Sequence, residues 1–228
     1  MFVACHLLLG LIIGLAIARH LGDRRFIGFA ALGAVLPDLI DKPVGHILLA
    51  ESLNSGRLFT HGLLFLALLL MAGIILERRR GSFALLAVAA GVLSHQILDA
   101  MWAAPVAWYF PFLGPYQPRE FTDYFGNAIL AEVSSLSEWI FLAAAAAIIL
   151  ALYRGARPGF LAIARTLARV AIPLLMLLTL ASLYAWAAGI PESILMAGGS
   201  GEDYLLLAAV GAAGIAGMVR YRDLLALG

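Results

Sequence analysis

Long apolar runs constrain this chain more than any other feature of its sequence. Six runs approach the roughly 20 residues that an α-helix needs to cross a bilayer: Phe2–Ala18, His61–Leu76, Ser82–Met101, Ile129–Leu152, Val170–Ala188 and Tyr204–Val219. A seventh run begins at Phe26 and is interrupted at Pro37. Because proline removes a helical hydrogen bond, we expect a second helix broken or kinked there. The runs predict an all-α, polytopic bundle of about seven transmembrane helices.

Scarce charge supports the same class of protein. Of the 228 residues, 63% are hydrophobic and 13% are charged, whereas soluble domains carry about 25% charged residues. A net charge of +1 is too small for a surface that follows nucleic-acid phosphates, so we expect no nucleic-acid partner. The single cysteine, Cys5, excludes an internal disulfide. We therefore expect a multi-pass protein of the inner or plasma membrane.

The basic residues predict an orientation. Every other connection carries most of them, namely Arg19, Arg24, Arg25, Arg78, Arg79, Arg80, Arg154, Arg157, Arg165, Arg169, Arg220 and Arg222. The positive-inside rule makes these connections cytoplasmic, so the N-terminus is expected outside and the C-terminus inside. Residues 1–150 then carry the polar groups and an outer loop, 102–127, rich in aromatic residues and proline. Residues 151–228 provide two scaffold helices.

Seven ionisable side chains fall well inside these runs, where such groups are costly and usually functional, and Glu132 lies near the edge of a run. The seven are His6, Asp38, Asp41, His61, His95, Asp99 and Glu138. Counting 1.5 Å per residue from the inner arginines puts all seven about 20–29 Å above the inner face of a core about 30 Å thick. His46 comes out nearer the outer surface and is expected to be structural. The count predicts one polar layer in the outer half of the membrane.

The residue types in this layer are typical of a metal site. His95 and Asp99 are four residues apart and share a helix face, as do Asp38 and Asp41 at a spacing of three. Imidazole and carboxylate ligands suit zinc, or manganese or iron where oxygen donors dominate. The number of groups allows one or two divalent ions, with Asp99 bridging a pair. Each piece also has a plainer interpretation, as a helix-packing histidine, a helix cap or an intrahelical hydrogen bond.

Three motifs resemble those of a known family. They are the strings GAVLPDLIDKP at 33–43, GRLFTH at 56–61 and SHQILDAMW at 94–102. Together with His6 they resemble the membrane-bound metal-dependent hydrolases, inner-membrane proteins of bacteria and archaea, over residues 1–150. The resemblance implies a metal-dependent hydrolytic activity.

The order of the polar residues is also similar to that of the zinc-dependent phospholipases C and single-strand nucleases. That similarity implies a set of metal ligands, namely His6, Asp38 or Asp41, His61, His95 and Asp99. Those enzymes add a late His-x-x-x-Glu, whereas here Ser134 stands four residues before Glu138. Glu138 is therefore expected as a lone ligand or a general base.

We expect a hydrolase that cleaves a phosphoester of a membrane lipid or lipid-linked substrate at the outer leaflet, where Asp41 or Glu138 orients or deprotonates water. Arg57 and Arg119 are candidates for holding the phosphate, because arginine binds phosphate bidentately. Lys42 flanks the same groups, and Trp102 begins the outer aromatic loop. Two alternatives stay open: a transporter of a metal ion or a proton, and a non-catalytic protein in which the metal joins helices.

Overall fold

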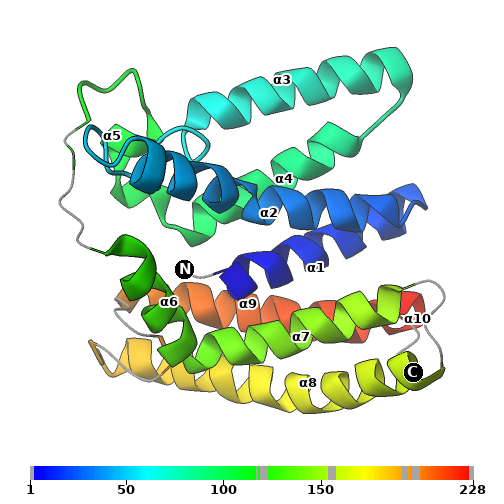
Figure 1. Ribbon diagram of the computed structural model, residues 1–228. Helices are drawn as coiled ribbons and strands as arrows, with labels where there is room; N and C mark the ends of the chain where they lie inside the picture. The colour runs from blue at the N-terminus through cyan, green and yellow to red at the C-terminus, as the bar shows by residue number, and fades with distance from the viewer. Residues whose placement is uncertain are drawn as a thin grey trace.

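The computed structural model describes residues 3–116, 118, 123–153, 158–191, 195–196 and 201–225, which form helices joined by loops (Figure 1). The α-helices are α1 (Val3–Leu21), α2 (Arg25–Pro43), α3 (Leu63–Arg80), α4 (Ala84–Leu98), α5 (Pro105–Trp108), α6 (Tyr124–Ser134), α7 (Leu136–Leu152), α8 (Pro158–Ala187), α9 (Gly201–Arg220) and α10 (Arg222–Leu225). A π-helical turn, η1 (Val44–Leu48), follows α2, and a 3₁₀ turn, η2 (Met101–Ala103), follows α4. The all-α class is confirmed.

Several helices are long and apolar enough to cross a membrane. In the described part of the chain these are Val3–Leu21, Gly159–Ala187 and Gly201–Arg220, and a fourth span is present if α6 and α7 count as one. These two helices meet at a bend of 76°, within the run expected as one straight span. A helical membrane protein is therefore supported, while seven crossings and the orientation stay predictions.

Helix α1 lies at the centre of the packing. It contacts α2 and α4 on one side and α7 and α9 on the other, while α8 packs on α7 and α9 and α3 packs on α4 (Figure 1). The main apolar core joins buried side chains of α1, α7, α8 and α9 with a few from α2 and α4, and a smaller cluster joins α3 and α4. Of the polar residues, Asp38 and Asp41 lie on α2 and His95 on α4, whereas Glu138 lies on α7.

Small residues let these helix backbones approach closely. A Cβ added to Gly33 on α2 would collide with the backbone of Val88 on α4, and one added to Gly91 would collide with the carbonyl of Ala30. Close approach of this kind is the usual way in which helices associate in lipid, where no hydrophobic force drives them together. The glycines set the spacing between α2 and α4.

Helix α2 departs from the expected break. It stays helical through Pro37 and continues to Pro43, and the hydrogen-bonding pattern changes only at Val44, where η1 begins. A proline removes one hydrogen bond, and the bonds of the flanking turns hold the helix together. The predicted break at Pro37 is therefore wrong, while a kink there stays a prediction, and the irregular turn lies after Pro43. π-Helical turns of this kind occur frequently at functional sites.

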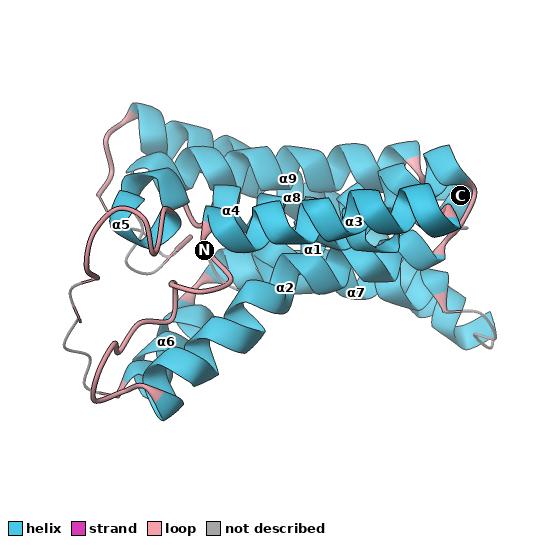
Figure 2. Cartoon of the chain, turned by 90° about the horizontal axis from the view of Figure 1, so that it is seen from above, coloured by secondary structure: helices cyan, strands magenta, loops and turns pink. Residues whose placement is uncertain are grey.

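The arginine-bearing turns gather at one end of the bundle. A cavity of about 460 Å³ is lined by residues of both the α1–α2 turn and the α3–α4 turn, and Arg24 Nη2 donates a hydrogen bond to the carbonyl of Leu224, 3.1 Å away. The longer loops lie at the opposite end, beside α5 and α6 (Figure 2). The pattern of basic residues thus predicts which of these connections share an end.

Candidate metal centre

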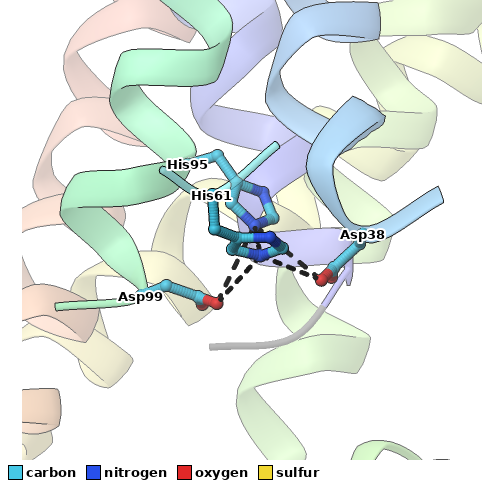
Figure 3. A group of neighbouring side chains, drawn as sticks. All are labelled: Asp38, His61, His95 and Asp99. Carbon is cyan, nitrogen blue, oxygen red and sulfur yellow. Dashed lines mark hydrogen bonds and ion pairs between the residues drawn. The ribbon is translucent and has the colours of Figure 1, made fainter. Parts of the chain in front are cut away.

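Four buried side chains converge at the loop-bearing end of the bundle. Asp38 comes from α2, His61 from the segment before α3, His95 from the last turn of α4, and Asp99 from the residue that ends α4. Each offers one ligand atom, and these four atoms all lie within 4.8 Å of one another (Figure 3). Residues 61 apart in the sequence are thus brought to one point.

The spacing of the four atoms suits a small divalent cation. His61 Nε2 and His95 Nε2 are 3.0 Å apart. Asp38 Oδ1 lies 3.6 Å from the first and 3.8 Å from the second, and Asp99 Oδ2 lies at the same two distances. A tetrahedral zinc ion with bonds of about 2.0–2.1 Å separates its ligand atoms by about 3.4 Å. The group is therefore close to the size that zinc requires.

Hydrogen bonds fix the tautomers of both histidines. His61 Nδ1 lies 2.8 Å from Asp41 Oδ2, and His95 Nδ1 lies 2.7 Å from the carbonyl oxygen of Ala34. Both partners are acceptors, so each Nδ1 carries the proton and donates it. A neutral ring then directs the bare lone pair of Nε2 at the centre, which is the arrangement found in metal-binding histidines.

With both rings neutral, the centre presents two Nε2 lone pairs and two carboxylate oxygens close to one another. Asp38 Oδ1 is buried and makes no hydrogen bond within the described residues. A proton on one Nε2 would bridge the two rings, but both carboxylate oxygens are 3.6 Å or more away, which is too far for a hydrogen bond. A cation stabilises all four atoms at once, so the donor set fits a metal ion.

Asp41 lies beside this group and outside it. Its carboxylate accepts hydrogen bonds from the backbone N–H of Leu58 at 2.9 Å and of Thr60 at 3.0 Å, from the Thr60 hydroxyl at 2.8 Å, and from His61. Of the two aspartates left open as ligands, Asp38 belongs to the group. Asp41 instead fixes the segment that carries His61.

His6 adjoins the centre from α1. Its ring stacks on that of His95 with centroids 3.9 Å apart, and its Nε2 lies 3.2 Å from Asp99 Oδ1. His6 is therefore a neighbour of the four-residue group that contacts the second oxygen of Asp99.

Glu138 occupies a different place. It lies in the first turn of α7 and accepts hydrogen bonds from the backbone N–H groups of Ala4, at 2.8 Å, and Cys5, at 3.4 Å. These are donors of the first turn of α1, which otherwise lack a helical partner. Glu138 therefore anchors the start of α1, and it is not one of the four converging residues.

The outer cations pair with the two carboxylates of the group. Lys42 Nζ lies 2.6 Å from Asp38 Oδ2, and Arg57 Nε lies 3.0 Å from Asp99 Oδ2. The Asp99 carboxylate raises the pKa of the Arg57 guanidinium, so this group stays charged. Trp102 lies in η2 with 45% of its surface exposed, and Arg119 lies outside the described residues.

Comparison with known proteins gives the family. The profile of the YdjM inner membrane protein family matches residues 1–190, which include every residue of the four-residue group. The chain belongs to the YdjM inner membrane protein family. It is therefore an inner-membrane protein, as the sequence predicts, whereas the hydrolase activity implied by resemblance stays a prediction. No curated protein and no solved structure matches the chain.

In this YdjM family member, sequence reasoning missed two features around the centre. Gln96 donates a hydrogen bond to the carbonyl of Gly62, at 3.2 Å, and accepts one from Trp108 Nε1, at 3.2 Å, so it ties the start of α3 to α5. His46, expected to be structural, lines a cavity of about 300 Å³ together with Arg57. Its position next to Arg57 depends on the loop between η1 and α3, which has no periodic pattern.

Proposed function

We propose that the protein is an integral-membrane, metal-dependent hydrolase that cleaves a phosphoester of a lipid or lipid-linked substrate. One observation carries the proposal: two Nε2 atoms, each on a ring whose Nδ1 donates a hydrogen bond, and two carboxylate oxygens converge in a buried group that one divalent cation could bind as a whole. Buried, convergent ligands of this kind support a resident metal better than a hydrogen-bonded packing contact.

Asp38, His61, His95 and Asp99 hold the ion in this proposal, and two imidazoles with two carboxylates favour zinc over manganese or iron. A divalent ion held there supplies Lewis-acid chemistry, which activates water near neutral pH and polarises a phosphoryl oxygen. His6, beside Asp99 Oδ1, is the donor available to a second ion.

The surrounding residues have separate tasks. Asp41 holds His61 in the ligand tautomer and is assigned a positioning role in place of the expected catalytic one. Arg57 and Lys42 provide positive charge at the outer side of the centre, and charged nitrogen donors suit the anionic oxygens of a phosphoester. The large apolar helices around the group favour a substrate that reaches it from the lipid.

A second candidate is a non-catalytic protein in which the ion joins α2, α4 and the segment before α3. The complete burial of His61 and His95 favours this candidate, because a structural ion has all its positions filled by protein. The two candidates differ in turnover, not in metal content.

Metal analysis of the purified full chain tests the proposal first. We expect at least one zinc, manganese or iron ion per chain, and a loss of most of it in His95→Ala and in Asp38→Asn. His20→Ala, an exposed histidine at the end of α1, is the matched control and should keep the wild-type content. Gel filtration and thermal unfolding in detergent show that the variants are folded. Less than one tightly bound ion per wild-type chain would refute the proposal.

Lipid hydrolysis separates the two candidates. We expect the metal-loaded protein to release a phosphorylated or dephosphorylated headgroup from at least one member of a phospholipid panel, and a chelator to abolish this release. Chelation that unfolds the protein, with no turnover on any lipid before chelation, would favour the structural ion.

A further inference from the structure

A cavity of about 300 Å³ lies next to the four-residue group, since Arg57 lines the cavity and contacts Asp99. Its lining includes His46, Ser55, Gly56, Arg57, Tyr116 and Tyr124. The volume is at the lower end of small-molecule sites, about 300–1,000 Å³, so it suits a polar headgroup rather than a whole lipid.

Arg57 connects this cavity to the centre. Its side chain is 50% exposed and lines the cavity, while its Nε binds Asp99 Oδ2 at 3.0 Å. A guanidinium carries five N–H donors in a planar fork, so contact through Nε leaves further donors for a ligand. The cavity therefore has a charged anion-binding group at its inner wall.

One wall of the cavity consists of closely packed aromatic rings. The ring of His46 stacks on that of Tyr124 with centroids 3.6 Å apart. A Cβ on Gly56 would lie 2.8 Å from His46 Nε2 and 3.1 Å from Lys42 Cγ. The absence of a side chain at this position lets η1 and the loop close on one another, which gives the cavity a defined wall.

The two carboxylates of the centre use their oxygens differently. Asp38 divides them, since Oδ1 faces the histidines and Oδ2 binds Lys42. In Asp99 a single oxygen has both contacts, because Oδ2 faces His61 and His95 and also contacts Arg57. A cation at the centre would therefore draw on the oxygen that Arg57 contacts and would repel the guanidinium, while the Lys42–Asp38 pair uses the other oxygen of its carboxylate.

From this asymmetry we infer that the cavity binds the phosphate of the substrate headgroup, and that Arg57 exchanges Asp99 for that phosphate when a divalent ion occupies the centre. The inference rests on the proposed function and names Arg57 as its specificity-determining residue. Arginine suits the task, because its fork binds phosphate oxygens bidentately. The ion and the phosphate then bind cooperatively, with Arg57 as the group they share.

Calorimetric titration of the full chain in detergent with glycerol 3-phosphate tests this exchange. We expect zinc-loaded protein to bind it at least about tenfold more tightly than chelated protein, and Arg57→Gln to lose at least about tenfold in affinity. Arg25→Gln is the matched control, since Arg25 also pairs with a carboxylate, Asp23, at the opposite end of the bundle. It should stay within about twofold of the wild type.

Zinc affinity distinguishes the exchange from a merely structural role of Arg57. Loss of a structural residue would weaken zinc binding, whereas loss of Arg57 in the exchange strengthens it. Arg57→Gln removes the competitor for Asp99 Oδ2, so we expect tighter zinc binding in this variant and an intermediate value in Arg57→Lys. Weaker zinc binding in Arg57→Gln would overturn the exchange.

Dihexanoyl phosphatidic acid, which carries the same phosphomonoester, distinguishes a lipid headgroup from a free phosphate. Tighter binding than that of glycerol 3-phosphate supports the lipid source, and equal binding supports a soluble one. Zinc-loaded wild type that binds neither probe, or Arg57→Gln that binds as well as wild type, would overturn the inference while leaving the proposed function intact. A wild type without zinc would instead refute the proposed function.

Discussion

Replacing Asp41 by asparagine tests whether this buried carboxylate sets the tautomer of His61. The substitution keeps the size of the side chain and removes its charge. An amide oxygen in the place of Oδ1 still accepts from the N–H and the hydroxyl of Thr60. Leu58 N–H and His61 Nδ1 both face Oδ2 and lose their acceptor. The amide NH₂ then takes the place of an acceptor near His61 Nδ1, and two donors oppose one another. The ring relieves this conflict by moving its proton to Nε2, where the lone pair is lost to a metal.

The structure allows the size of the effect to be estimated. Loss of the hydrogen-bonding partner of a metal-binding histidine lowers metal affinity about 10–100-fold, which corresponds to about 1.4–2.7 kcal/mol. The free energy of unfolding should also fall, by about 1.5–3 kcal/mol, the value of one hydrogen bond to a charged group. The second effect is independent of metal.

Competition with a chelator of known zinc affinity measures the first quantity, and thermal unfolding of the metal-free protein in detergent reports the second. Thr60→Val is the control, because it removes only the neutral hydroxyl donor to Asp41, 2.8 Å away. Its zinc affinity should fall by less than about threefold, since the charge and the His61 contact remain.

An Asp41→Asn variant that binds zinc within twofold of the wild type would refute the tautomer argument. A variant that keeps its zinc affinity and loses all turnover would assign Asp41 the role of a general base, as the sequence pattern predicts. The two results separate positioning from catalysis at one residue.

Three further predictions concern packing, the start of α1 and orientation. Gly33→Ala should destabilise the protein by about 1–3 kcal/mol through overpacking against α4, and it should weaken zinc binding. Gly28→Ala is the control, because its Cβ meets nothing within 4 Å. It should change neither the unfolding temperature nor the zinc affinity. Glu138→Gln keeps an acceptor for α1 and should lower the unfolding temperature while leaving zinc content unchanged; a loss of zinc would place Glu138 in the site. In a chain without its native cysteine, Asn54→Cys should react with an impermeant maleimide on intact cells and Ser82→Cys only after lysis, and the reverse would overturn the predicted orientation.

Depth counting finds the site residues well, because it needs only helix geometry. Asp38 and His95 lie on α2 and α4, and Asp99 directly follows α4. Both helices begin at the arginine-bearing end, so counting 1.5 Å per residue from there brings the three residues to a common level. His61 is found by the same count although it lies in the loop before α3. Counting gives height and not rotation about the helix axis, so it also includes Glu138, which turns toward the start of α1.

The sequence pattern does not predict the contacts that loop segments make. Asp41 and Asp38 share a helix face and cannot be ranked by spacing, since the choice depends on where the segment 58–61 closes against α2. The continuation of α2 through Pro37 is missed for a related reason. The low helix propensity of proline reflects the hydrogen bond that it removes. It does not include the hydrogen bonds and packing of the neighbouring turns, which hold the helix together.

The precision of the centre depends on the small residues between α2 and α4. In lipid, apolar helices gain little by exchanging lipid contacts for one another, so close approach requires residues without bulk. Gly33 and Gly91 bring the two backbones into direct contact, and the lone pair of His95 reaches Asp38 from the adjoining turns of the same helices. An added methyl group at Gly33 meets the backbone of Val88, which belongs to a second apolar cluster with Leu66, Ala89 and Val92. The same displacement of α4 acts on this packing and on the ligand spacing, so Gly33→Ala should lower the unfolding temperature and the zinc affinity together.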